Sequence, residues 1–216
     1  MKIIFCLPGK SFTQGFMQSW TKTLAYCMRT GTEIELSWGY SSSVFHCRND
    51  LVSMDKNPEL PEQRLQPFMG QDYDFAMWID SDTVWEPEDI QRLVDADQDI
   101  ISGFVPVSPQ HAAVGLFNDF NPSLFVRNSA VKEFAEQGGL FEADFAGFAF
   151  ILIKKGVFES MEYPWFRPDV RTLPNGRILF PSEDFAWCMR AKELGWKIYA
   201  HPQVQPGHQK EMTMGP

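Results

Sequence analysis

The sequence predicts an α/β fold in which a Rossmann-like, mixed but mainly parallel sheet is flanked by helices. Two observations carry this prediction. The chain opens with a strand at 2–7, a helix at 14–28 and a second strand at 33–38, an order typical of a parallel crossover. Every residue of 75–79 is apolar, which indicates a strand buried on both faces in the middle of such a sheet.

The elements of the first half are bounded by turn residues. Pro8 and Gly9 end the first strand, and Gly31 ends the first helix as a helix-terminating glycine does. Pro87 suits the first turn of a later helix, because an N–H at that position makes no hydrogen bond within the helix. The other elements expected in this half are helices at 44–54 and 87–96 and a strand at 99–104.

The second half is expected to contain strands, helices and one long connection. Ser182 is a favourable N-cap for a helix that runs to residue 194, and a last strand covers 196–200. The segment 163–181 is irregular and rich in Pro, Arg and aromatic residues, and loops of this length usually serve function. The other expected elements are paired strands at 111–117 and 122–127, an aromatic strand at 140–153 and a helix starting within 154–158.

The charge balance limits the class of partner. The 216 residues suffice for one domain and carry a formal net charge of −9. An acidic chain is a poor partner for nucleic acid or for an anionic membrane surface. If the substrate is an anion such as a diphosphate, a divalent cation has to reverse the local charge.

The cysteines and the hydropathy pattern bear on location. No Cys-x-x-Cys pair occurs, which argues against a structural zinc site. Cys6 and Cys27 lie in apolar segments, as inert core thiols in a reducing compartment do. The sequence shows no signal peptide and no apolar run long enough to span a membrane, so we expect a soluble cytoplasmic protein.

The segment Asp80-Ser81-Asp82 is the first candidate site. It follows the buried strand at 75–79 and so lies at the sheet edge where open α/β folds bind ligands. Carboxylates two residues apart can reach one hard cation, which suggests a metal-assisted site for a diphosphate-bearing substrate. The alternative is that both aspartates only form a turn and cap the helix that Pro87 opens.

Two further residues allow a functional and a structural interpretation. The guanidinium of Arg48 can grip phosphate or orient a carboxylate, or it can be a solvated helix charge that pairs with Asp50 or Asp55. Gly147 interrupts an aromatic strand. It can mark a bulge or a close approach of backbone to a ligand, or it can allow tight packing against a neighbouring Trp or Phe.

Three other features are weaker alone. Pro8-Gly9-Lys10 lacks the spacing of a P-loop, yet its backbone can line a base or ribose pocket. Glu183 and Asp184 suit the first turn of a helix, and this alone explains them structurally. A lone histidine such as His208 is more often a satisfied or solvated residue than a ligand.

In chain order, these features resemble the GT-A nucleotide-sugar glycosyltransferases. The stretch Cys47-Arg-Asn-Asp-Leu-Val52 is similar to the Arg-Asn segment of many of them. The other segments that carry the resemblance are the strand ending in Asp80-Ser-Asp82, Gly147 in its aromatic strand, Ser182-Glu-Asp184 with Phe185-Ala-Trp-Cys188, Gly195-Trp-Lys-Ile-Tyr199, and His208. The resemblance spans residues 3–208. In its short length, the chain resembles a bacterial or viral member of the family.

The resemblance implies a role for each matching residue. Asp82 and His208 would bind Mn²⁺ or Mg²⁺, and Asp184 would be the catalytic acid residue. Asp80 would bind the donor ribose or sugar and share in the metal, and Glu183 would hold an acceptor hydroxyl or a neighbour. The remaining donor-binding residues that the resemblance implies are Leu7, Pro8, Gly9, Arg48, Asn49, Ser81 and Gly147.

The activity implied is metal-dependent transfer of a sugar, hexosyltransferase-like, from a nucleotide diphosphate to an acceptor hydroxyl. UDP is the commonest donor nucleotide, and the acceptor is an unidentified saccharide, lipid or protein. Residues 1–104 would be the nucleotide-binding half and 105–216 the acceptor and catalytic half of one domain. The alternatives are a nucleotidyltransferase, disfavoured because a Gly-rich loop with Arg and Lys is missing after the first strand, and a non-catalytic nucleotide-sugar-binding module.

Overall fold

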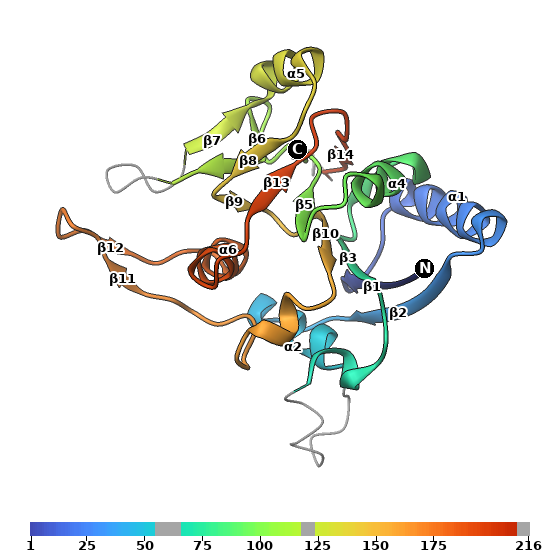
Figure 1. Ribbon diagram of the computed structural model, residues 1–216, viewed down its shortest axis with the longest axis horizontal. Coiled ribbons are helices and arrows are strands. Elements are labelled where there is room, and N and C mark those ends of the chain that lie inside the picture. The colour runs from blue at the N-terminus through green and yellow to red at the C-terminus, as the bar shows by residue number, and fades with distance from the viewer. Residues whose placement is uncertain (55–65, 118–123, 211–216) are drawn as a thin grey trace, which may run out of the picture.

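A seven-stranded sheet lies at the centre of the computed structural model, which describes residues 1–54, 66–117 and 124–210 (Figure 1). In spatial order its strands are β2 (Glu33–Gly39), β1 (Lys2–Pro8), β3 (Phe75–Ile79), β10 (Phe150–Lys154), β5 (Ile100–Ser102), β13 (Ile198–Ala200) and β8 (Phe141–Ala143). β1 is parallel to β2 and β3, and β5 is parallel to β13. β10 and β8 are antiparallel to their neighbours, so the predicted mixed, mainly parallel sheet is confirmed.

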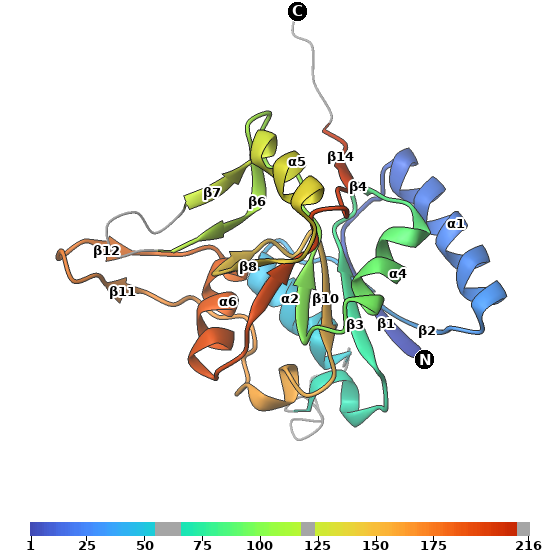
Figure 2. The ribbon, with the colours of Figure 1, turned by 45° about the horizontal axis from the view of Figure 1, so that its top comes forward.

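Helices cover both faces of this sheet, as Figures 1 and 2 show. They are α1 (Gln14–Thr30) and α4 (Pro87–Asp95) on one face and α2 (Val44–Ser53) and α6 (Glu183–Glu193) on the other. Met77 of β3 packs in one apolar cluster with Phe16 and Ile90. Trp78, the next residue, packs in the other with Trp187. Because successive side chains of a strand point to opposite faces, a strand covered on both sides needs an unbroken apolar run.

The predicted helix boundaries have local causes. The Thr13 hydroxyl accepts a hydrogen bond from the Phe16 amide at 3.2 Å and so caps the start of α1. Gly31 ends α1 with φ of 70°, a left-handed conformation that glycine adopts without strain. Pro87 lies in the first turn of α4, which a reciprocal pair of hydrogen bonds between Glu86 and Asp89 caps.

Outside the central sheet, the described strands form three small sheets. They are a sheet of β7 (Leu124–Arg127), β6 (His111–Leu116) and β9 (Phe145–Ala146), a pair of β4 (Thr83–Val84) and β14 (Gly207–His208), and a hairpin of β11 (Arg171–Thr172) and β12 (Ile178–Leu179). Helix α5 (Asn128–Gln137) follows β7, and 3₁₀ turns cover Pro67–Gly70 and Phe158–Ser160. In Figure 2, β14 lies beside β4, and the β11–β12 hairpin projects from the body of the molecule.

Several predicted elements differ from those observed. The strand expected at 140–153 is three short strands, because the chain leaves the central sheet after β8, pairs with β6 through β9 and returns as β10. The helix expected within 154–158 is only the 3₁₀ turn at Phe158–Ser160. Helix α5 was not predicted, and the irregular 163–181 segment contains the β11–β12 hairpin. The pairing of β6 with β7 confirms the expected strand pair. Residues 118–123, which include the expected start of the second strand, lie outside the described residues.

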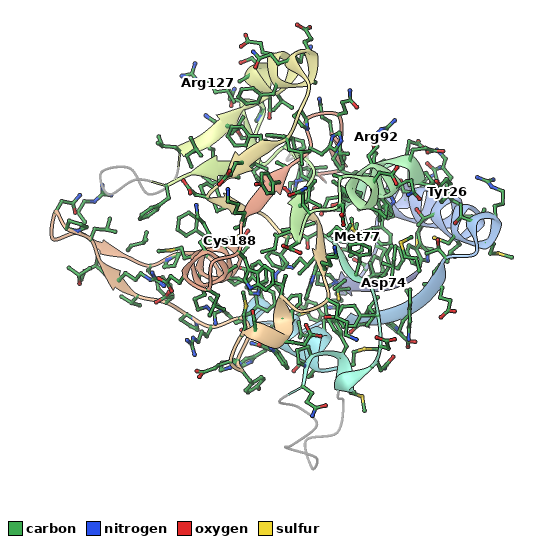
Figure 3. The ribbon with its side chains drawn as sticks, viewed as in Figure 1. Tyr26, Asp74, Met77, Arg92, Arg127 and Cys188 are labelled. Atoms are coloured by element: carbon green, nitrogen blue, oxygen red, sulfur yellow. The ribbon has the colours of Figure 1, made fainter. Side chains whose placement is uncertain are left out.

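The four cysteines are free and buried, which confirms Cys6 and Cys27 as core thiols. Burial raises the pKa of Cys188, which Figure 3 labels on α6, to about 12, so this thiol is a poor nucleophile. Among the described helices, none combines the length and the apolar character that crossing a membrane requires.

Candidate active site

The segment Asp80-Ser81-Asp82 lies where β3 ends, at the edge of a hollow of about 500 Å³. The Asp80 amide donates to the Ala149 carbonyl at 3.1 Å, and the Thr83 amide donates to the Asp80 carbonyl at 3.0 Å. These bonds hold the turn at the carboxyl edge of the sheet. The hollow is lined by Pro8, Ser11, Thr13, Val44, Arg48, Asp80, Ser81, Asp82, Glu183, Gln209 and Lys210.

Arg48 of α2 joins two acidic residues beneath this hollow. Its side chain is buried, with Nε 3.1 Å from Glu183 Oε1 and Nη2 3.6 Å from Asp80 Oδ1. The guanidinium also lies 5.4 Å from the ring centre of Trp78 and 5.1 Å from that of Phe148, a cation–π arrangement. The alternative in which Arg48 is a solvated helix charge is therefore wrong.

Charge interactions at this point act in opposite directions. Burial alone would lower the pKa of Arg48, but the nearby carboxylates, Asp80 foremost, raise it. Loss of hydration raises the pKa of Asp80, and Arg48 opposes this rise. The carboxylates of Asp82 and Asp184 raise the pKa of Asp80 further, so the site gathers more negative charge than Arg48 neutralises. Such a site favours an added cation.

Asp82 and His208 meet although 126 residues separate them. Their Oδ2 and Nε2 atoms are 2.8 Å apart, because β14 pairs with β4 directly after Asp82. His208 Nδ1 lies 2.9 Å from the Pro106 carbonyl, which can only accept, so Nδ1 carries a hydrogen and Nε2 of the neutral ring offers a lone pair. A backbone-oriented imidazole beside a carboxylate fits a divalent cation such as Mn²⁺.

The cation would need further ligands from elsewhere. Within the described part of the chain, no three His, Cys, Asp or Glu side chains are gathered closely enough to form a cage. Asp80, the third predicted ligand, is instead turned toward Arg48. A site of two protein ligands suits an ion that keeps water or takes substrate phosphate oxygens.

Asp184 faces a second hollow, of about 230 Å³, which it lines with Gly147, Phe125, Phe180 and other residues. Its Oδ1 accepts from the Phe185 amide at 2.7 Å and from the Ser182 hydroxyl. Ser182 occupies the N-cap position of α6, but its hydroxyl bonds Asp184 rather than a helix amide, which differs from the predicted cap. Glu183 lines the first hollow and Asp184 the second, so the start of α6 reaches both.

The other predicted donor-binding residues have packing roles in the structure. Leu7 is buried in the core. Gly9 approaches Ser81 so closely that a Cβ atom there would lie 2.6 Å from the Ser81 Cβ. The Asn49 amide bonds the Phe166 backbone in both directions, with Nδ2 to the carbonyl at 2.5 Å and the Phe166 amide to Oδ1 at 3.0 Å. Asn49 thus holds the loop beneath Arg48 and does not line the hollow.

Sequence reasoning missed the contributions of Ser11, Thr13, Val44, Gln209 and Lys210 to the hollow. One local signal was available for Lys210. In an extended segment, residues two apart point to the same side, so a ligand role for His208 places Lys210 beside it.

The substitution Gly147→Ala tests the close packing beside Asp184. A Cβ atom at this position would lie 2.9 Å from the Ala113 Cβ and 3.5 Å from Asp184 Oδ2. We expect the free energy of unfolding, measured by urea denaturation, to fall by about 1–3 kcal/mol, because neither backbone can withdraw easily. Gly39→Ala is the matched control, since its Cβ would meet only Leu51 at 3.8 Å. Equal stability of the two variants would contradict the packing argument.

Comparison with known proteins identifies the fold. No protein-family model matches the sequence, and no curated protein matches it. The crystal structure of A197 from STIV is 14% identical, with a TM-score of 0.53 over 100% of this chain and 98% of that chain. The structure of GalNAc-T7 with UDP, GalNAc and Mn²⁺ is 9% identical, with a TM-score of 0.60 over 98% of this chain and 43% of that one.

This chain therefore spans less than half of the GalNAc-T7 chain. The likeness concerns the arrangement of the sheet and its helices, because at this identity the sequences share little. The class that the comparison defines is the mixed α/β fold with a central, mostly parallel sheet flanked by helices. Within that class, the chain has the GT-A fold of glycosyltransferases, as the sequence predicted.

Proposed function

We propose that this protein is a metal-dependent glycosyltransferase that moves a sugar from a nucleotide-diphosphate donor to an acceptor hydroxyl. A UDP-sugar is the donor that we expect. The observation that carries the proposal is the contact of Asp82 Oδ2 with His208 Nε2, which are 2.8 Å apart, beside the hollow that Asp82 lines together with Arg48 and Asp80. The GT-A fold supports it, as does the presence of UDP and Mn²⁺ in the structure of GalNAc-T7.

Asp82 and His208 would hold the cation. It would supply a counter-charge to the diphosphate as the bond from the sugar to phosphate breaks. The chain needs this charge, because its net charge of −9 repels an anionic donor. Arg48 holds Asp80 in place at the floor, and the Asp80 side chain is 32% exposed, so its carboxylate is open to a ribose or sugar hydroxyl.

The acceptor would enter the second hollow, where Asp184 is the only acidic residue among the described residues of the lining. If the reaction inverts the anomeric centre, Asp184 takes the proton of the acceptor hydroxyl as general base. If it retains the configuration, the leaving phosphate takes that proton and Asp184 stabilises the sugar cation. Phe125 and Phe180, both exposed, offer flat surfaces that suit a saccharide acceptor.

Two other expectations stay predictions. One is the cytoplasmic location. The other is the division into a nucleotide-binding half at 1–104 and a catalytic half at 105–216. The site draws on both halves, since Asp82 comes from the first and His208 from the second.

Asp82→Ala tests the metal assignment. Calorimetric titration of the wild-type protein with UDP and with GDP, each with and without Mn²⁺, should show binding of one nucleotide that depends on the metal. In the variant we expect this affinity to fall by more than about tenfold, because half of the protein's ligand set is gone. Asp72→Ala is the control, since that carboxylate is 96% exposed and pairs with Lys155 at the surface. Unchanged metal-dependent binding by Asp82→Ala would refute the assignment.

A further inference from the structure

The ammonium group of Lys210 lies between the two side chains assigned to the cation. Its Nζ is 2.8 Å from His208 Nε2 and 3.4 Å from Asp82 Oδ2. These are the same two atoms that approach each other to 2.8 Å. A positive group of this chain thus contacts both proposed ligand atoms.

The segment that carries Lys210 is anchored to the site. The Gln209 amide donates to the Asp82 carbonyl at 2.8 Å, and the Gln209 side chain accepts from the Gly15 amide at 3.2 Å. The Lys210 side chain is 63% exposed, however, so its flexible stem can carry the ammonium away into water. The backbone therefore brings Lys210 to the site without locking its charge there.

The hydrogen-bond chemistry of His208 makes the two cations alternatives. Because Nδ1 donates to the Pro106 carbonyl, Nε2 of the neutral ring has a single lone pair. That lone pair can accept a hydrogen from the Lys210 ammonium or bind a metal ion, but it cannot do both. Two positive groups sharing one carboxylate oxygen would also repel each other.

We propose that Lys210 is a built-in competitor for the divalent cation. In the absence of metal, its ammonium holds Asp82 and His208 together in the arrangement that binds the cation. When a divalent ion binds, Lys210 leaves both atoms and turns toward the hollow that it lines. This inference rests on the proposed metal site, and it predicts that the affinity for the ion is weaker than Asp82 and His208 alone would give.

Direct Mn²⁺ binding, without nucleotide, tests the inference. Free Mn²⁺ is measured by electron paramagnetic resonance during titration of the wild-type protein and of Lys210→Met, which keeps the length of the side chain and removes its charge. We expect Lys210→Met to bind Mn²⁺ about two- to fivefold more tightly, the range of an exposed ion pair. Lys210→Arg, which keeps the charge, should stay near the wild-type affinity.

Two controls separate the possible failures. Lys155→Met removes a lysine paired with Asp72 at the surface and should leave Mn²⁺ binding unchanged. Asp82→Ala combined with Lys210→Met should bind Mn²⁺ more weakly than Lys210→Met alone, because the carboxylate ligand is missing. If the wild-type protein and Lys210→Met bind Mn²⁺ equally, the competitor role is wrong and the metal site stands. If neither binds Mn²⁺, the metal site itself is wrong, and the competitor role fails with it.

Discussion

Asp184→Asn is expected to lower turnover by about 10²- to 10⁴-fold, the usual contribution of a general base or its equivalent. The amide has the shape of the carboxylate, and its oxygen can still accept from the Phe185 amide and the Ser182 hydroxyl. The fold and the start of α6 are therefore kept. What is lost is the carboxylate that would accept the proton of the acceptor hydroxyl or stabilise the sugar cation. Release of nucleoside diphosphate from the donor that the titrations identify is the measurement.

Glu88→Gln is the matched control for this variant, because it neutralises an exposed carboxylate on α4. Nucleotide binding by Asp184→Asn should equal that of the wild-type protein, since Asp184 lines the second hollow and not the first. Full turnover by Asp184→Asn would exclude a catalytic role. Donor binding without any turnover by the wild-type protein would favour the non-catalytic module.

Arg48→Met is expected to lower the free energy of unfolding by about 3 kcal/mol, the lower end of the range for breaking a buried ion pair. The lower end applies because Asp80 is 32% and Glu183 13% exposed and water screens them in part. Without the guanidinium, both carboxylates lose their counter-charge, and the pKa of Asp80 loses the group that opposes its rise. Urea denaturation at neutral pH measures the change.

The control is Arg92→Met, which removes a 45% exposed guanidinium paired with Asp89 on α4. It should change stability by less than about 1 kcal/mol. Arg48→Lys should fall between the two, because a lysine keeps the charge but cannot reach two carboxylates as a planar fork does. A loss below 1 kcal/mol for Arg48→Met would show that Arg48 does not hold the site together.

The first half of the fold and part of the site were predictable from local sequence. The apolar run of β3 and the two aspartates after it indicate a buried strand and its carboxyl edge, whatever the rest of the chain does. The division of 140–153 into three strands was not predictable, because an aromatic run has the same pattern whether it stays in one sheet or passes from one sheet to another. The structure decides this through the pairing of Ala146 with Val114 in a separate sheet.

The remaining site contacts depend on pairs far apart in the chain. Arg48 contacts Glu183 although 135 residues separate them, and the sequence around either residue does not indicate its partner. Helix α5 was missed for a related reason. Its Val131 is buried and its Phe134 stacks on Phe141 of β8, so this helix packs against a strand that follows it in the chain.

The pairing of β14 with β4 gives the proposed cation a second effect. Two residues of each strand are paired, and the Gln209 amide adds a hydrogen bond to the Asp82 carbonyl at 2.8 Å. A ligand that binds only the paired state shifts that local equilibrium by mass action. The ion would therefore join distant parts of the chain, and the order of this strand would report whether the site is filled. Under the proposed function, the concentration of divalent metal would then set both the filling of the site and the pairing of this strand.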